Sequence, residues 1–399
     1  MIEMEYYFSD KMKALKPSAI REIFKSLGDP EMISFAAGNP SPRSFPVEEL
    51  SRIGADIFAN ASTAALQYSV TEGYPPLRSE VEKRMREKFN IGREGDMTII
   101  TSGGQQGIEL SCKALCNEGD VVICEDPTFI GALNAFRSCG AKTVGLPLGD
   151  DGIEAESLDK LLTETPNAKI VYLIPTFQNP AGICTSLEKR KAVYDVCVKH
   201  GIIIIEDNPY GELRFAGEDI PTIKSMDTEG IVLYSSSFSK ILSAGMRVGY
   251  MCGPEPIIQK MVVAKQSEDV HTNIFFQMLT HRFMTECDLD GHIQGIRGLY
   301  RDKCSLMLST LDRVMPECVK YTRPQGGLFL WLTLPEEIKM IDFVQRALEN
   351  KVAVVPGNTF LCDTAGAINA VRLNYSTPSD EDIVRGCEIL GRVAREMLA

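Results

Sequence analysis

The sequence has little positive charge and few histidines, and each shortage narrows the possible functions. Among 399 residues, 42 lysines and arginines stand against 54 aspartates and glutamates, so the formal net charge is −12. A protein that binds a phosphate backbone or an anionic membrane surface needs a basic face, so nucleic acid and membranes are not expected partners. The four histidines, His200, His271, His281 and His292, lack metal-ligand spacing, and no metal site is expected.

Long apolar runs and closely paired cysteines are also missing. No run approaches the roughly 20 apolar residues that span a bilayer, and the acidic N-terminus has no apolar segment of the kind found in secretory signals. The 12 cysteines form no C-x-x-C pair, and several of them (Cys124, Cys197, Cys252) lie in apolar runs. We therefore expect reduced, buried thiols and a cytoplasmic protein.

The middle of the chain alternates short apolar runs with helical patterns. The runs are Val121–Cys124, Ile170–Ile174, Ile202–Ile205 and Ile231–Tyr234, all rich in β-branched residues. Uninterrupted runs of this kind are typical of parallel strands buried on both faces. Helical spacing appears between them, for example in Leu187–His200. This alternation predicts an α/β domain with a mostly parallel sheet between layers of helices.

The last hundred residues have a different pattern, which predicts a smaller α+β domain. Helical stretches alternate there with short strand-like segments, and we expect the first thirty-odd residues to pack on this domain or on a partner subunit. The predicted helices are Gly295–Leu311, Met340–Asn350 and Asp380–Leu398, and the predicted strands are Gly327–Leu332, Val352–Val355 and Ala370–Tyr375.

Two ionisable residues follow the apolar runs of the middle region. Asp207 comes directly after Ile202–Ile205, and Lys240 follows Ile231–Tyr234 and a serine cluster. Ligands of parallel α/β sheets bind at the carboxyl ends of the strands, so both residues are candidates for a site. Asp207 is equally compatible with a turn or a helix cap, and Lys240 with a solvated loop. A lysine that is partly buried would have a lowered pKa and become nucleophilic.

Further polar residues occupy comparable positions. A glycine turn at Ser102–Gly107 links the strand-like Thr98–Thr101 to a helical pattern, which is a natural phosphate seat or an ordinary turn. Asn179 follows Ile170–Ile174 and is a hydrogen-bonding group or a turn residue. Arg247, seven residues after Lys240, carries a guanidinium that can grip a phosphate. Together these residues supply a phosphate seat, an anion clamp, a carboxylate and an amine at one sheet edge.

Combined, these motifs resemble the fold-type-I pyridoxal-phosphate (PLP) aminotransferases of class I/II, especially the 2-aminoadipate, kynurenine and aromatic aminotransferase subgroup. The resemblance runs nearly end to end and implies a large PLP-binding domain at 47–285 and a small domain at 286–399 joined by 1–46. It rests on Ile33–Pro40, on Gln-Asn-Pro-x-Gly at 178–182, on Asp-x-x-Tyr at 207–210, on Ser-Phe-Ser-Lys at 237–240 with arginine at 247, and on Arg-Leu-Asn at 372–374.

The resemblance also implies roles for individual residues. Lys240 would form the imine with the cofactor and move the substrate's α-proton, and Asp207 would keep the pyridine nitrogen protonated. Asn179 and Tyr210 would hydrogen-bond the phenolic oxygen, and Arg372 would bind the substrate carboxylate bidentately near the Gly38 backbone, with Asn179 beside it. The phosphate would be held by the turn at Gly103, Gly104 and Gln105, by Ser237 and Arg247, and by Tyr68 of a neighbouring subunit.

The sequence departs from the family pattern at two positions. Phe129 stands where the family usually has a tyrosine that stacks on the cofactor, so stacking remains but any hydroxyl contact is lost. The phosphate seat reads Gly-Gly-Gln at 103–105, where Gly-Ser-Gln is commoner, and the backbone N–H groups remain. Arg21 lies in a segment that resembles an N-terminal helix of the 2-aminoadipate group. It would meet a distal substrate carboxylate, or it is a surface arginine paired with a nearby glutamate.

We therefore expect an aminotransferase that acts by a ping-pong mechanism. It would move the amino group of a 2-aminoadipate, aromatic or branched-chain L-amino acid to a 2-oxo acid such as 2-oxoglutarate, as a homodimer. A PLP-dependent C–S β-lyase would use the same fold and site and remains open at this stage. Regulators that share the fold carry a basic DNA-binding domain before it. Since the family pattern begins near Ser18 and the chain is acidic, we expect an enzyme instead.

Overall fold

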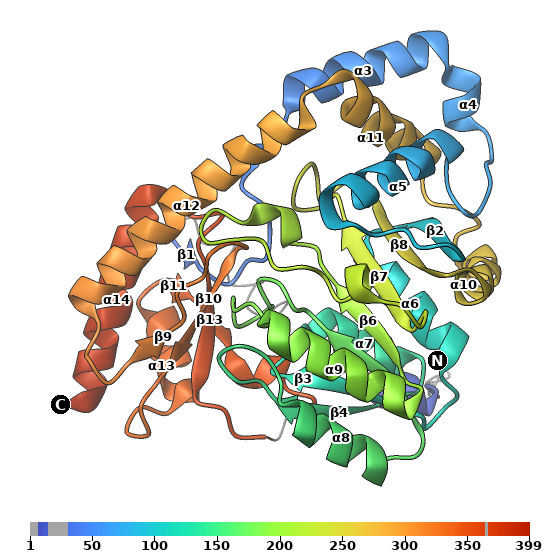
Figure 1. Cartoon of the computed structure of the whole chain (residues 1–399). Helices are drawn as coiled ribbons and strands as arrows, with labels where there is room; N and C mark the ends of the chain where they lie inside the picture. The colour runs from blue at the N-terminus through green and yellow to red at the C-terminus, as the bar shows by residue number, and fades with distance from the viewer. Residues whose placement is uncertain (1–6, 15–30, 364–365) are drawn as a thin grey trace, which may run out of the picture.

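The computed structural model describes residues 7–14, 31–363 and 366–399, and a seven-stranded sheet forms its centre (Figure 1). The strand order is β2-β8-β7-β6-β5-β3-β4, and β8 runs in the opposite direction to the other six strands. The strands are β2 (Asp96–Thr101), β3 (Val121–Asp126), β4 (Lys142–Pro147), β5 (Ala168–Leu173), β6 (Ile203–Asp207), β7 (Val232–Ser237) and β8 (Gly249–Pro254). The four apolar runs are thereby confirmed as β3, β5, β6 and β7, with slightly different ends.

Helices cover both faces of this sheet because its strands are apolar on both faces. In β3, Val122 and Cys124 pack on one side with α6 (Gly104–Leu115), α7 (Ile130–Ser138) and α10 (Glu255–Glu268). Val121 and Ile123 point to the other side, against α8 (Ala155–Glu164) and α9 (Leu187–His200). Successive side chains of a strand alternate between faces, so a continuous apolar run fills both cores. The predicted α/β fold is confirmed.

The helix predicted at Leu187–His200 is α9, with the same bounds. It begins after Ser186, whose side chain accepts a hydrogen bond from the Lys189 N–H at 3.3 Å, and it ends at Gly201 with φ of 66°. A serine N-cap and a left-handed glycine are common helix ends. Beyond the sheet, four helices pack together at the top of Figure 1: α3 (Val47–Asn60), α4 (Ser62–Leu66), α5 (Pro75–Phe89) and α11 (Ile274–Glu286).

The C-terminal part holds a four-stranded antiparallel sheet in the order β12-β13-β10-β9. Two long helices, α12 and α14, lie side by side and pack on one face of this sheet (Figure 1). The strands are β9 (Lys320–Tyr321), β10 (Phe329–Thr333), β12 (Val355–Pro356) and β13 (Ala370–Asn374), and the helices are α12 (Leu289–Val314), α13 (Met340–Glu349) and α14 (Asp380–Leu398). The helix α12 starts earlier than predicted, because the Asp288 side chain caps it by accepting from the Gly291 N–H at 2.8 Å.

One predicted strand proves to be two. The segment Val352–Val355 contains β11 (Val352–Ala353), which pairs with β1 (Ile33–Ser34), and then β12, which pairs with β13 in the other sheet. The apolar pattern runs through the break because both halves are buried. A hydrophobic pattern reports burial and does not show which sheet provides the pairing partner.

The described N-terminal residues contact two different parts of the chain. The pairing of β1 with β11 joins residues 33–34 to the C-terminal part. The helix α1 (Asp10–Ala14) lies against α7, and its Lys11 forms an ion pair with Glu118, which follows α6; packing of this segment on a partner subunit stays a prediction. The domain bounds near residues 46 and 286 stay a prediction.

Candidate active site

Polar residues from several strand ends meet at one edge of the large sheet. The segments after β2, β5, β6 and β7 reach this edge because those strands are parallel, and the start of β8 reaches it because β8 runs the opposite way. A cavity of about 380 Å³ opens there. The residues proposed from the sequence that line it are Gly38, Gly104, Gln105, Phe129, Asn179, Asp207, Tyr210, Ser237, Lys240, Arg247 and Arg372.

Lys240 is partly buried in this cavity and has few partners. Its Nζ donates to the Gly38 carbonyl oxygen at 2.7 Å and lies 5.9 Å from the centre of the Tyr210 ring. Burial, with help from the positive charges of Arg372 and Arg247, lowers the pKa of Lys240 to about 8. A substantial fraction of the amine is therefore neutral near physiological pH, which is the form that attacks a carbonyl.

Asp207 is a buried carboxylate at the end of β6. Strand alternation turns it to the same face as Ile205, toward α6, and a Cβ built on Gly104 would lie 4.0 Å from Asp207 Oδ1. The Tyr172 hydroxyl, from the adjacent strand β5, donates to Asp207 Oδ2 at 2.7 Å. Burial raises the pKa of Asp207 to about 6, and the Tyr172 hydrogen bond limits that rise. At neutral pH the group is still an anion, and among the described residues no lysine or arginine pairs with it.

The glycine turn and Arg247 form a cradle at the N-terminus of α6. Gly103 has φ of 81°, and a Cβ at this position would meet Arg247 Nη2 at 2.1 Å, so only glycine allows the guanidinium so close. Arg247 itself is exposed, with φ of 55°, and donates to the carbonyl oxygens of Ser102 and Ala244 at 3.2 Å each. Ser237 Oγ donates to Ser239 Oγ at 2.8 Å. Helix N–H groups, hydroxyls and a guanidinium are the donors that a phosphate requires.

Arg372 in β13 is almost fully buried and is held mainly by aromatic faces. Its guanidinium carbon lies 4.2 Å from the centre of the Phe329 ring and 5.0 Å from that of Phe360. Nη1 donates to Asn179 Oδ1 at 3.0 Å and Nη2 to the Ala36 carbonyl at 2.8 Å, while Nε finds no partner among the described residues. Burial lowers the pKa of Arg372 to about 10, so it stays charged and available to a carboxylate.

The remaining cavity residues form its walls. Burial raises the pKa of Tyr210, so its hydroxyl stays protonated and can donate. Phe129 lies at the start of α7, and Gln105 Nε2 donates to the Gly131 carbonyl beside it at 2.7 Å. Asn179 precedes a cis proline, Pro180. A larger cavity of about 520 Å³ elsewhere contains none of the proposed residues.

Among the described residues, two of the proposed set, Tyr68 and Gly103, do not line the cavity. Tyr68 is 81% exposed on the surface, where its ring meets that of His271 edge-on at 5.9 Å between centroids. Arg21 lies outside the described residues. Gly103 is part of the turn but does not line the cavity.

Sequence reasoning missed three residues that shape the site. Tyr172 lies within an apolar run and looks like core, and only its alternation with Ile170 and Ile174, on the face that Asp207 shares, points to it. Phe329 and Phe360 also read as core residues. No pattern along the chain indicates that their rings face Arg372.

The residue set fits pyridoxal phosphate. A buried carboxylate without a cationic partner suits a protonated pyridine nitrogen, the cradle suits a phosphate, and a partly neutral lysine suits an aldehyde. Within the described part of the chain, no helix is long and apolar enough to cross a membrane, and no cluster of three or more histidine, cysteine or acidic residues has metal-binding geometry.

Comparisons with known proteins agree with this arrangement. Residues 30–390 match the family described as aminotransferase class I and II. The chain is 39% identical to aromatic-amino-acid aminotransferase 1 of Thermococcus litoralis, over 99% of this chain and 95% of the relative. It is 38% identical to 2-aminoadipate transaminase of Thermus thermophilus, over 96% of each. The crystal structure of Pyrococcus horikoshii kynurenine aminotransferase superposes with a TM-score of 0.94 at 38% identity, covering 98% of both chains. The chain belongs to the class I and II aminotransferases and is a pyridoxal-phosphate-dependent enzyme.

Proposed function

We propose that the enzyme moves the amino group of a 2-aminoadipate, aromatic or branched-chain L-amino acid to a 2-oxo acid such as 2-oxoglutarate. The relatives named for aromatic amino acids, 2-aminoadipate and kynurenine support this substrate class. The observation that carries the proposal is the placement of Lys240 and Arg372 in one cavity: a partly neutral amine and a buried guanidinium open to a carboxylate.

The surroundings of the cavity residues support a role for each of them. When bound, pyridoxal phosphate supplies an aldehyde that takes up the amino group and a ring that draws electrons from the reacting carbon. Asp207 would hold the positive ring nitrogen, and Tyr172 keeps that carboxylate in place. The Tyr210 hydroxyl and the Asn179 amide would hydrogen-bond the phenolic oxygen. The turn at Gly103–Gln105, Ser237 and Arg247 would bind the phosphate, and Tyr68 of a second subunit would add a hydroxyl.

Lys240 is the group that moves the proton. With the cofactor bound, the neutral Nζ of Lys240 would accept the proton of the substrate α-carbon, hold it and give it back. Arg372 would bind the α-carboxylate by two N–H donors, with Asn179 and the Gly38 backbone beside it, and would so hold the substrate near Lys240. Phe129 provides an apolar wall that excludes water from the reacting atoms.

A donor screen tests the proposal. The purified enzyme with PLP is given single L-amino acids and 2-oxoglutarate, and formation of glutamate and the matching 2-oxo acid is measured. Initial rates at varied concentrations of both substrates should give parallel reciprocal plots, as two separate half-reactions require. Pyruvate and ammonia released from cysteine conjugates without an acceptor, in the absence of transamination, would instead indicate the C–S β-lyase.

The Arg21→Ala variant tests a narrower part of the proposal. If Arg21 binds a distal carboxylate, the variant loses activity with 2-aminoadipate far more than with leucine or phenylalanine. Equal losses with acidic and apolar donors would show that Arg21 does not select the substrate.

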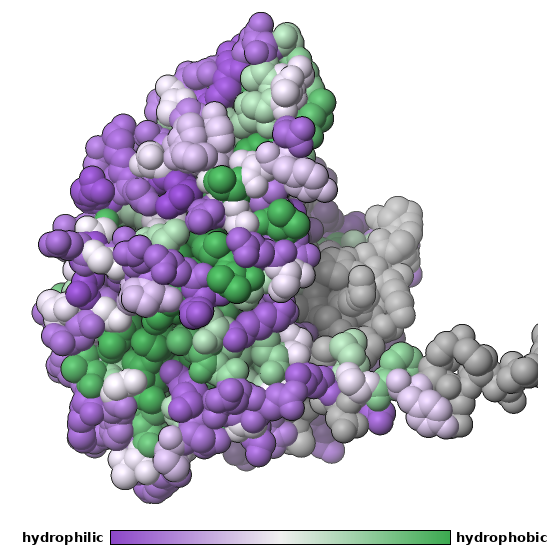
Figure 2. All heavy atoms as spheres, turned by 90° about the vertical axis from the view of Figure 1, so that its right-hand side faces the viewer, coloured by the Kyte–Doolittle hydropathy of each residue, from purple (hydrophilic) through white to green (hydrophobic). Residues whose placement is uncertain are grey.

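We propose that the enzyme is a homodimer. Figure 2 shows apolar side chains gathered in patches on the side of the molecule that carries α4 and α10. In and just after α4, the exposed apolar residues include Leu66, Tyr68 and Val70. In and just after α10, they include Val263 and Val270. Large exposed apolar areas mark interfaces, and an exposed Tyr68 is free to reach a second subunit. Sedimentation would show a dimer. In hybrid dimers made from a Tyr68→Phe chain and a Lys240→Ala chain, one of the two sites would keep both native residues. That site would combine Lys240 of the first chain with Tyr68 of the second.

The division into domains at 47–285 and at 1–46 with 286–399 is also proposed. The pairing of β1 with β11 across the sequence supports it, since it ties residues 33–34 to the C-terminal part. We further propose a cytoplasmic location, which fits the 12 free cysteines.

A further inference from the structure

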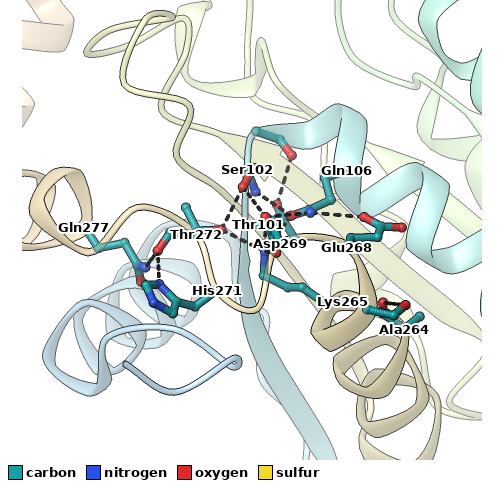
Figure 3. Close-up of polar contacts among 12 residues, drawn as sticks. Thr101, Ser102, Gln106, Ala264, Lys265, Glu268, Asp269, His271, Thr272 and Gln277 are labelled. Atoms are coloured by element: carbon teal, nitrogen blue, oxygen red, sulfur yellow. Dashed lines mark hydrogen bonds and ion pairs between the residues drawn. The ribbon is translucent and has the colours of Figure 1, made fainter. Parts of the chain in front are cut away.

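A network of polar side chains adjoins the phosphate-binding turn outside the cavity lining. It joins Ser102 in the turn and Gln106 in α6 to Lys265 in α10 and to Asp269 and Thr272, which follow that helix (Figure 3). The chemistry described above does not use these residues.

Lys265 is the centre of the network. Its side chain is fully buried, and its Nζ contacts three acceptor groups: Gln106 Oε1 at 2.7 Å, Thr272 Oγ1 at 3.0 Å and the Asp269 carboxylate at 2.8 and 2.9 Å. An ammonium has three N–H donors, so each finds a partner. Burying a charge is costly unless it is paired in this way, so the buried ammonium of Lys265 depends on these three partners.

The network holds Ser102 by its backbone and side chain. The Ser102 N–H donates to Gln106 Oε1 at 2.8 Å, and Ser102 Oγ donates to Asp269 Oδ2 at 2.8 Å. Since that hydroxyl has already given its hydrogen, Thr272 Oγ1 is the donor in their 3.1 Å contact. Arg247 binds the Ser102 carbonyl from the cavity side. The residue before Gly103 is therefore held at its N–H, its side chain and its carbonyl group.

Charge gives Lys265 a second effect. Asp269 accepts from Ser102 Oγ and from Gln106 Nε2, each at 2.8 Å. Its carboxylate is therefore hydrogen-bonded to the residue that directly precedes Gly103 of the phosphate-binding turn. A negative charge at this place opposes the binding of a phosphate dianion, and the adjacent ammonium of Lys265 compensates it.

We propose that Lys265, together with Asp269, Gln106 and Thr272, is a positioning cluster that orders the Ser102–Gly104 turn for the cofactor's phosphate and neutralises Asp269 beside it. This inference rests on the proposed phosphate role of the turn. It assigns the cluster to phosphate recognition and not to proton transfer.

The test compares two cofactor forms on apoenzyme. Pyridoxal phosphate and pyridoxal both form an imine with Lys240, but only the first has a phosphate. Lys265→Met should weaken binding of pyridoxal phosphate by about tenfold or more, the effect of losing one buried charged partner, and leave binding of pyridoxal nearly unchanged. Lys260→Met, on an exposed position of the same helix, is the matched control and should change neither affinity. Imine absorbance gives the affinity directly.

Two further variants separate the electrostatic effect from a loss of structure. Lys265→Met combined with Asp269→Asn removes the uncompensated carboxylate and should recover part of the lost affinity. Ser102→Ala removes the side-chain link between the turn and Asp269, while the N–H bond to Gln106 and the pairing of Lys265 remain. It should weaken binding of pyridoxal phosphate selectively even if Lys265→Met does not fold. Its control is Ser267→Ala on α10, whose hydroxyl donates only to the Ala264 carbonyl among the described contacts.

These measurements distinguish an error in the inference about Lys265 from an error in the proposed function. If wild-type apoenzyme forms no imine with pyridoxal phosphate, the proposed function itself is wrong. If the wild type binds and Ser102→Ala and Lys265→Met lose affinity for pyridoxal as much as for pyridoxal phosphate, or lose neither, the cluster does not act through the phosphate and the inference is overturned.

Discussion

Two buried lysines of this protein differ in how completely they are paired. Lys224 donates to Asp96 Oδ1 at 2.8 Å and to Asp227 Oδ2 at 3.0 Å, so two carboxylates surround its charge. Lys240 has one carbonyl oxygen at 2.7 Å, and the charges that act on it, those of Arg372 and Arg247, are positive. Two carboxylates pair the charge of Lys224, whereas the surroundings of Lys240 destabilise its ammonium and favour the neutral amine.

Two buried arginines repeat this contrast. Arg190 donates to the carbonyl oxygens of Thr185, Pro175 and Pro221 and to Thr176 Oγ1, all within 3.0 Å. Arg372 has two acceptors, an unpaired Nε and two aromatic faces. Fully paired charges hold segments together. Charged groups that face the cavity with few partners can still bind a ligand. The number of partners therefore distinguishes structural from functional ionisable groups in this fold.

The lysines give the largest expected effects. Lys240→Ala should lower kcat by about a thousandfold or more, because the proton-transferring amine is gone, with little loss of stability. Lys224→Met should leave turnover per folded molecule intact. It should lower the free energy of unfolding by about 3–5 kcal/mol, because two buried carboxylates lose their cation. Steady-state rates and urea unfolding of both variants measure the contrast, and a Lys240→Ala enzyme with near wild-type kcat would break it.

The aspartates should differ in the same way. Asp207→Asn should lower kcat about a hundredfold or more, since the buried anion for the ring nitrogen is lost while the fold keeps its Tyr172 contact. Asp227 accepts from Lys224 and from the N–H groups of Gly230 and Ile231, so Asp227→Asn should mainly lower stability. Kinetics corrected for the folded fraction distinguishes them. Equal catalytic losses in both variants would show that pairing does not mark function.

The arginines provide a smaller effect. Arg372→Lys loses the bidentate grip and should lower kcat/KM by about tenfold to a hundredfold, mostly through KM for the amino acid. Arg190→Met should instead lower stability, since several buried carbonyl groups lose their donor. An Arg372→Lys enzyme with unchanged KM for the donor would contradict the assignment of this residue.

The pH dependence of cofactor uptake gives the smallest and most specific signal. The pKa of Lys240 is lowered to about 8 from its usual value near 10.5, so protonation below pH 8 removes the nucleophilic form. The rate at which apoenzyme forms the imine should therefore rise with pH and level off above a midpoint near 8. In an Arg372→Met variant, one neighbouring positive charge is gone, and the midpoint should move upward. A midpoint that stays near 10.5 in the wild type would show that the amine is not destabilised.

Much of this picture was predictable from the sequence because strand ends are visible in it. Asp207, Asn179 and Lys240 each follow an apolar run, and parallel strands bring such positions to one edge. Arg247 reaches that edge for a different reason, the antiparallel direction of β8, which no apolar run reveals. Its placement rested on its closeness to Lys240 in the sequence, seven residues away.

Other features depend on contacts in three dimensions that the amino-acid sequence does not show. Tyr172, Phe329 and Phe360 have the burial pattern of core residues, and only packing turns their polar or aromatic surfaces toward the site. The segment Val352–Val355 divides between two sheets although its pattern is continuous. The role proposed for Tyr68 depends on a second subunit.

Lys240 is the lysine expected to carry the cofactor, and its chemical labelling is the most direct test. Reducing the imine of the PLP-loaded enzyme with borohydride fixes the pyridoxyl group, and peptide mass spectrometry then locates it. The contrast in pairing predicts a single label on Lys240, with Lys224 and Lys265 unlabelled. A label on another lysine, or none after reduction of a protein that has bound PLP, would contradict the account.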